Sequence, residues 1–85
     1  MEVRFAEAAL ADIDSLRSHI ALDNPPAANR MAVAIVAAID RLEANPRLGR
    51  VGAVPGAFEL VVRPYIVVYE IIRTEIVILR VWHER

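Results

Sequence analysis

The 85-residue chain contains no cysteine and no lysine, and only two histidines and three glycines. Without cysteine there is no disulfide framework, no thiolate metal site and no thiol nucleophile. Two histidines are too few for a typical zinc cage, and the glycines lack the spacing of a phosphate-binding loop. We therefore expect the protein to work with neither a metal nor another cofactor.

Long hydrophobic runs are also missing. No apolar stretch approaches the roughly 20 residues that a membrane-spanning helix needs, and the start, Met1 to Arg4, lacks the basic and apolar regions of a secretory leader. We therefore expect a cytoplasmic protein that makes no contact with a membrane. The length predicts a single domain, residues 1–85.

What the chain has in excess is apolar residues. Ala, Val, Ile, Leu, Met, Phe, Trp and Gly make up 49 of the 85 residues, or 58%, against roughly 45–50% in ordinary domains, although small domains have proportionally more surface to cover. Part of this excess should lie exposed, which indicates a partner or a self-association surface.

The charge is uneven although its net value is only −1. Residues 1–44 carry four arginines and seven acidic residues, whereas residues 45–85 carry six arginines and four acidic residues. The basic half could face an anion or an acidic peptide. The small net charge argues against strong non-specific binding of nucleic acid.

Two helices are predicted after a short strand at residues 2–5. In residues 6–22, apolar side chains recur every three to four positions, as on one face of a helix; they are Leu10, Ile13, Leu16 and Ile20. Asn24 is a good N-cap and Pro25 suits a first helical position, so a second helix is expected from about 25 to 44. Its apolar face consists of Met31, Ile35, Ala38, Ile39 and Leu42. The short connection predicts an antiparallel helical hairpin.

The rest of the chain is rich in β-branched and aromatic residues. Segments 60–62, 65–72 and 75–82 are predicted as strands, and their short connections predict an antiparallel meander. The order β-α-α-β-β-β predicts an α+β fold in which a helical hairpin packs on an antiparallel sheet.

The register of the last two strands depends on the turn at residues 73–74. With a turn of two residues, Tyr69 faces Ile78 and Tyr65 faces Trp82, whereas a turn of three residues shifts the pairing by one. Arg-Thr is a poor two-residue hairpin turn, which usually contains Gly or Asn. Both registers therefore remain open.

Polar residues of the strand region could support RNA cleavage without a metal. His83 could act as base or acid because its ordinary pKa lies near neutrality, and Arg63, Arg80 and Arg85 could stabilise the charge of a pentavalent phosphate. Structural roles compete with this interpretation. A histidine near a chain end is typically a surface residue, and Arg80 could pair with Glu70 or with an acidic partner.

Several weak sequence signatures follow one another in a specific order. They are Phe5-Ala6 with Ala11-Asp12-Ile13, the segment Asn24 to Arg30, Ile39 to Leu42, Asn45 to Arg50, and the block from Glu59 to Arg85. In this combination the chain resembles the RelE/ParE toxin superfamily of bacterial type II toxin–antitoxin modules. The resemblance covers nearly the whole chain and implies the same β-α-α-β-β-β order.

The resemblance implies a growth-inhibiting toxin held inactive by a cognate antitoxin, part of which wraps around the helices and sheet. RelE-like members are ribosome-dependent mRNA endonucleases, and ParE-like members inhibit DNA gyrase. A RelE-like activity would make Arg63 a phosphate-stabilising residue and would place His83 and Arg85 at the catalytic end of the last strand. These three residues are candidates for catalysis only in that case.

Two departures from the RelE-like pattern favour the ParE-like alternative. The chain is slightly acidic and has no lysine, and Phe58 stands where the family often has an arginine before Glu-Leu. We therefore favour DNA gyrase as target over the ribosome and its mRNA, with a non-toxic dimerising or degenerate module as a third alternative. Contacts with antitoxin or target are expected from Arg80, Tyr65, Tyr69 and Trp82. For the two tyrosines, packing in the fold with solvent-exposed hydroxyls is the favoured alternative.

Overall fold

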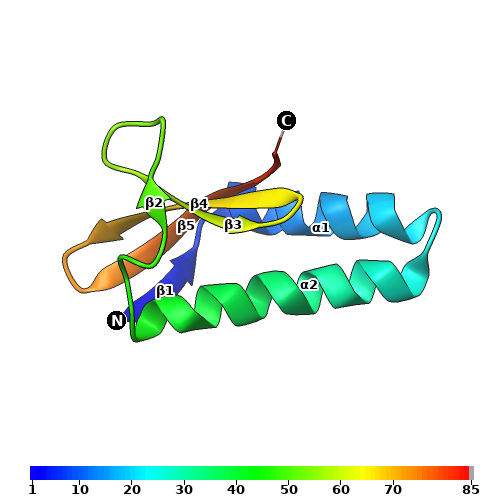
Figure 1. The fold of residues 1–85 in the computed structure, drawn as a ribbon, viewed down its shortest axis with the longest axis horizontal. Helices are drawn as coiled ribbons and strands as arrows, with labels where there is room; N and C mark the ends of the chain where they lie inside the picture. The colour runs from blue at the N-terminus through cyan, green and yellow to red at the C-terminus, as the bar shows by residue number, and fades with distance from the viewer. Residues whose placement is uncertain (85) are drawn as a thin grey trace.

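In a computed structural model, which describes residues 1–84, two helices lie against a five-stranded sheet (Figure 1). The elements are β1 (Glu2–Phe5), α1 (Glu7–Ala21), α2 (Pro25–Asp40), the short 3-10 turn η1 (Arg41–Glu43), β2 (Arg50–Val51), β3 (Phe58–Val62), β4 (Tyr65–Ile72) and β5 (Glu75–His83). The predicted α+β class and the order of the main elements are confirmed. Strand β2 is an addition, because its two residues were expected to lie in a loop.

The second helix forms as the sequence predicts. The Asn24 side chain accepts a hydrogen bond from the Ala27 N–H at 3.1 Å, so it caps the helix. The helix is followed directly by η1. The face that this continuous segment buries contains Ile35, Ala38, Ile39 and Leu42. Figure 1 shows the two helices side by side and antiparallel, with their connected ends reaching beyond the sheet.

The first helix buries a slightly different face from the predicted one. Leu16 is buried and Ile13 and Ile20 are partly buried, as expected, but Leu10 is 50% exposed and the expectation for it is wrong. Ala9 lies in the core in its place, with no exposed surface. Helix α1 packs against β5, and the small Ala9 side chain is part of the core cluster between helices and sheet.

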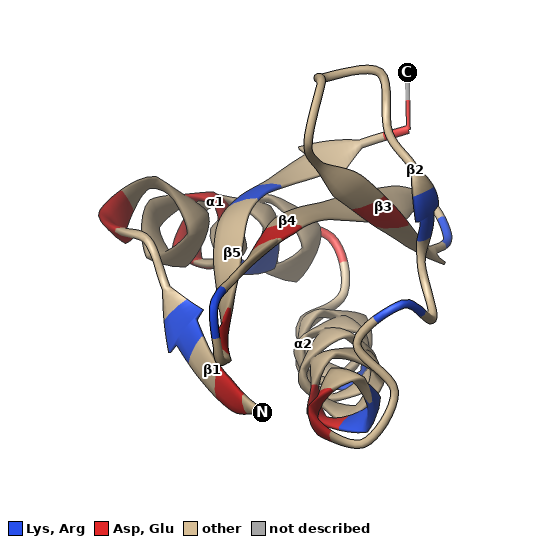
Figure 2. Cartoon of the chain, turned by 90° about the vertical axis from the view of Figure 1, so that its left-hand side faces the viewer, with Lys and Arg blue, Asp and Glu red and all other residues tan. Residues whose placement is uncertain are grey.

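The strand order across the sheet is β1-β5-β4-β3-β2. The meander of β3, β4 and β5 is antiparallel, as predicted. Strand β1 instead lies parallel to β5, with Glu2 opposite Glu75, so the expectation of an entirely antiparallel sheet is wrong at this edge. Figure 2 shows β1 beside β5, with α2 below the curved sheet.

The β4–β5 hairpin combines a two-residue turn with a bulge. Ile72 pairs with Glu75 across the turn, and Arg73 adopts a positive φ of 55°, a conformation that such a turn requires. Tyr69 therefore lies opposite Ile78, as the two-residue alternative predicts. Beyond the bulge the pairing shifts by one residue, so Tyr65 lies opposite His83 and not opposite Trp82.

Candidate functional site

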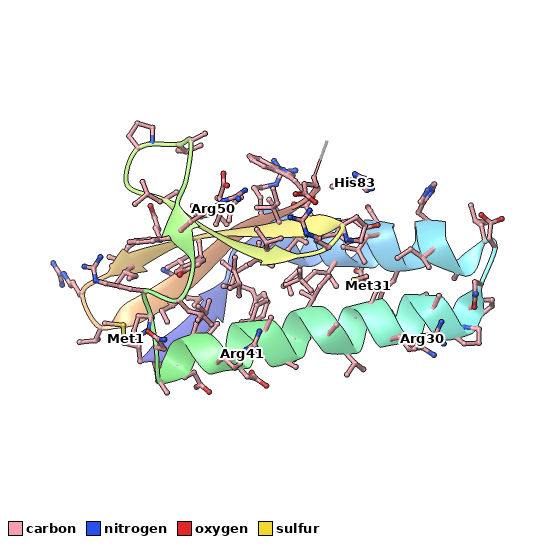
Figure 3. All side chains as sticks on the ribbon, viewed as in Figure 1. Met1, Arg30, Met31, Arg41, Arg50 and His83 are labelled. Atoms are coloured by element: carbon pink, nitrogen blue, oxygen red, sulfur yellow. The ribbon has the colours of Figure 1, made fainter. Side chains whose placement is uncertain are left out.

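Polar side chains gather where β4 begins and β5 ends. The register places Tyr65 beside His83. The two rings meet edge to face, with their centroids 5.3 Å apart. The Glu84 N–H donates to the Pro64 carbonyl at 2.7 Å, which brings the end of the chain back over the turn before β4. Arg63, at that turn, thereby lies at the same end of the sheet as His83, which Figure 3 labels.

Arg63 is held by an ion pair that the sequence did not reveal. Its Nη1 donates to both carboxylate oxygens of Glu84 at 2.9 Å. The arginine side chain is 75% exposed and the glutamate side chain 30% exposed, so the pair lies at the surface and is open to exchange with solvent. The arginine charge is nevertheless balanced by a neighbour, which reduces its pull on a phosphate.

A second ion pair joins α1 to β5. The Arg80 Nε and Nη2 atoms donate to the two oxygens of Asp12 at 2.7 and 3.0 Å, and the Val81 N–H donates to the same carboxylate at 2.9 Å. The hydrogen bond from Arg80 is the main cause that holds the pKa of Asp12 below its ordinary value. The structure therefore pairs Arg80 with Asp12, and not with Glu70 as one alternative had it.

The Asp12 pair predicts an acid-sensitive contribution to stability. Because the pKa of Asp12 is lower in the folded chain than in the unfolded one, its stabilising effect is complete above the unfolded pKa of about 3.9 and is lost as pH falls toward the folded pKa. Asp12→Asn should therefore lower the urea midpoint at pH 7 and flatten its fall between about pH 5 and pH 3. An equal acid response in Asp12→Asn and wild type would contradict this, and Asp14→Asn, an exposed neighbour on α1, is the control.

Of the four residues expected to contact a partner, two lie at the surface. Trp82 is 41% exposed, and the Arg80 guanidinium lies 5.4 Å from its ring centroid. Arg80 stands opposite the buried Val68 in the register, and its own side chain is 44% exposed. An exposed tryptophan beside an arginine is typical of protein interfaces.

The two tyrosines lie inside the molecule. Tyr65 is 7% exposed and Tyr69 is fully buried. The Tyr69 hydroxyl donates to the Pro46 carbonyl at 2.8 Å and accepts from the Gly49 N–H at 3.0 Å, and burial raises its pKa. Tyr69 thus has no surface left for a partner, and it holds the loop before β2 against the sheet.

A groove that the sequence did not indicate lies at the protruding end of the helical hairpin. Its volume is about 530 Å³, and it is lined by Asp14, Arg17, Ser18 and Ala21 from α1 and by Pro25, Ala28 and Asn29 from α2. The lining contains one acidic and one basic side chain beside apolar residues. No helix within residues 1–84 is long and apolar enough to cross a membrane.

Two further expectations concern catalysis and metals. Arg85, a candidate catalytic residue, lies outside the described residues. Among residues 1–84, no group of three or more histidine, aspartate or glutamate side chains is arranged to hold a metal ion.

Comparison with known proteins identifies relatives over nearly the whole chain. The family described as the ParE toxin of the type II toxin–antitoxin system parDE matches residues 3–85. The Sinorhizobium fredii protein Y4kP is 37% identical over 83 residues, which cover 95% of this chain and 85% of that protein. Toxin RelE2 of Caulobacter vibrioides is 35% identical over 75 residues, 88% of this chain and 85% of that protein.

Solved structures of toxin–antitoxin complexes share the fold. A chain of the chromosomal ParDE system from P. aeruginosa superposes with a TM-score of 0.88 at 29% identity, covering 100% of this chain and 97% of that chain. A chain of the RelBE2 complex from Mycobacterium tuberculosis gives a TM-score of 0.71 at 32% identity, covering 96% and 95%. Both complexes contain an antitoxin by their description, and both folds match the two helices and mixed sheet of this chain.

Proposed function

The chain belongs to the RelE/ParE superfamily of toxins from type II toxin–antitoxin systems, and from that premise we propose that it inhibits growth in the ParE manner, by binding DNA gyrase in the cytoplasm without cleaving RNA. A cognate antitoxin neutralises it. The match to the ParE family over residues 3–85 and the similarity to the P. aeruginosa ParDE chain support this choice.

The observation that carries the proposal is the ion pair of Arg63 with Glu84. A metal-free ribonuclease needs a cation directed at the phosphate that undergoes attack. In this chain both oxygens of Glu84 already accept hydrogen bonds from that arginine, and there is no lysine to replace it. The arginine of this cluster is therefore already paired, and inhibition by binding fits this better than catalysis does.

The antitoxin is expected to cover the surface that the core leaves open on β5. Trp82 offers an exposed aromatic ring, and residues 45–85 have more arginines than acidic residues. An acidic antitoxin segment that folds on binding would bury the ring and face the excess positive charge. This surface also fits the apolar excess of the composition.

A RelE-like endonuclease is the second candidate. The observation that favours it is that Arg63 and His83 lie at the same end of the sheet. In that case His83 would transfer a proton, and Arg63 would have to leave Glu84 to reach the phosphate.

The two candidates differ in how they depend on His83. We expect His83→Gln to remain toxic when induced without antitoxin, and the purified chain to inhibit supercoiling by gyrase while leaving mRNA on translating ribosomes intact. In a ribonuclease that uses His83 for proton transfer, the same substitution would lower the cleavage rate by about 100-fold or more. Growth curves, a plasmid supercoiling assay and primer extension on ribosome-bound mRNA measure the three effects.

Arg63→Ala and Glu84→Gln are measured in the same three assays. Binding of each variant to the product of the neighbouring antitoxin gene serves as the control for correct folding. If mRNA cleavage occurs and disappears in His83→Gln, the chain is a RelE-like endonuclease and the proposal is wrong. If induction changes neither growth nor gyrase activity, the chain is a non-toxic module.

A further inference from the structure

The outward side of α2 is an apolar surface that no other element covers. Val33 is 69% exposed and Val36 45% exposed, and with Ala32, Ala37 and Asp40 they line a shallow groove of about 370 Å³. We call the residues Arg30, Val33, Val36, Ala37 and Asp40 the outer face of α2. It lies on the opposite side of the helix from the buried Ile35 and Ile39.

The spacing along this face is that of a helix that packs against another helix. Arg30, Val33, Ala37 and Asp40 follow one another at intervals of three, four and three residues, which is the spacing of the apolar seam in a coiled coil. Only the two central positions are apolar. The two ends carry opposite charges, with Arg30 toward the helix start (Figure 3).

The order of these residues is self-complementary. Suppose that a second copy of α2 lies antiparallel across the seam, with a two-fold axis that crosses the outer face of α2 at the height of residue 35. Arg30 then lies against the Asp40 of the second copy, and Val33 lies against the second copy's Ala37. The same operation produces each contact twice, as in any isologous interface. Each layer then pairs an arginine with an aspartate or a valine with an alanine.

The charges at both ends lack partners within the described chain. No ion pair holds Arg30 or Asp40 within residues 1–84. Asp40 ends α2, where the helix dipole disfavours a negative charge. The Met1 ammonium reaches this end of the helix, but it donates to the Glu43 carbonyl at 2.9 Å. An arginine from outside the chain would balance the charge of Asp40.

We propose that the outer face of α2 binds a second copy of this chain, as an antiparallel helix pair with two Arg30–Asp40 ion pairs around Val33 and Ala37. The partner must supply a small apolar seam that ends in an arginine on one side and an aspartate on the other, and this chain itself carries that pattern. One helix pair makes a small contact beside the roughly 800 Å² per partner of standard interfaces, so we expect a weak, reversible dimer.

Charge exchange tests the pairing directly. Sedimentation equilibrium of the full chain, from about 5 to 500 µM at low salt, should show a reversible dimer. Arg30→Asp and Asp40→Arg should each weaken dimerisation by about tenfold or more, because each variant faces like charges twice. The double variant Arg30→Asp/Asp40→Arg restores opposite charges and should dimerise nearly as well as wild type, an outcome that a simple effect on folding would not give.

A disulfide provides a second measurement, since the chain has no native cysteine. The pair Val33→Cys/Ala37→Cys places thiols across the predicted seam and should form a covalent dimer on mild oxidation. The control pair Leu10→Cys/Asp14→Cys has the same spacing on exposed positions of α1 and should remain mostly monomeric.

Three results would overturn the proposal. They are a wild-type chain that stays monomeric up to about 500 µM, a double charge variant that dimerises no better than the single ones, and equal cross-linking of the two cysteine pairs. A monomeric chain whose charge variants lose affinity for the neighbouring antitoxin would assign this face to the antitoxin. None of these measurements depends on whether the toxin acts on gyrase.

Discussion

Replacing Leu42 by Ala is expected to lower the free energy of unfolding by about 2–5 kcal/mol. Leu42 has no exposed surface and belongs to the main core cluster, although it lies in η1 just beyond the end of α2. Alanine would remove most of a buried side chain and leave a cavity where the helical segment meets the core. Urea unfolding followed by circular dichroism measures the change.

Leu22→Ala is the matched control for this substitution. It makes the same chemical change at a position that is 81% exposed, so its effect should stay within about 0.5 kcal/mol. A loss below about 0.5 kcal/mol for Leu42→Ala as well would mean that the apolar stripe of the second helix faces a partner or solvent, and that its assignment to the core is wrong.

The helices could be predicted from the sequence because their signals are local. The cap at Asn24 and the apolar repeat around Ile35 act within a few residues of one another. The rotation of α1 about its axis could not be predicted from such local signals. Leu10 outranks Ala9 in hydrophobicity, yet Ala9 faces the core, on a helix that packs on β5 and whose Asp12 accepts hydrogen bonds from Arg80 of that strand.

The strand order and register of the sheet could not be predicted in the same way, because they depend on contacts between distant parts of the chain. The pattern at residues 2–5 predicts a strand, but it does not indicate that this strand pairs with β5 or that Glu2 lies opposite Glu75. The bulge in β5 likewise has no local signature. It nevertheless decides that Tyr65 lies opposite His83 and not opposite Trp82.

The candidate site was predictable in position but not in its pairing. Chain order alone places Arg63 before β4 and His83 at the end of β5, so their approach follows from an antiparallel hairpin. The Glu84 ion pair depends on how the chain turns at Pro64, which the sequence does not specify. Arg80 similarly finds its carboxylate on α1, 68 residues away in the chain.

Tyr69 shows why an aromatic residue on a strand cannot be assigned to a surface from its spacing. Its position was compatible with a partner contact, but that side of β4 faces the helices and the loop before β2. The ring stacks on Phe58 with centroids 5.4 Å apart, and the hydroxyl bonds to Pro46 and Gly49. Gly49 passes so close that an added Cβ would lie 2.8 Å from that hydroxyl.

Tyr69→Ala should therefore destabilise the chain by about 3–5 kcal/mol, the usual cost of removing a buried aromatic ring. This is a large share of the roughly 5–15 kcal/mol that a whole domain has. Tyr69→Phe keeps the ring and removes only the hydroxyl, leaving the Gly49 N–H and the Pro46 carbonyl without it, and should lose about 1–3 kcal/mol. Urea unfolding of both variants separates packing from hydrogen bonding. If Tyr69→Ala were as stable as wild type but failed to bind the antitoxin, Tyr69 would be a binding residue after all, because only a side chain outside the core can be removed at so little cost.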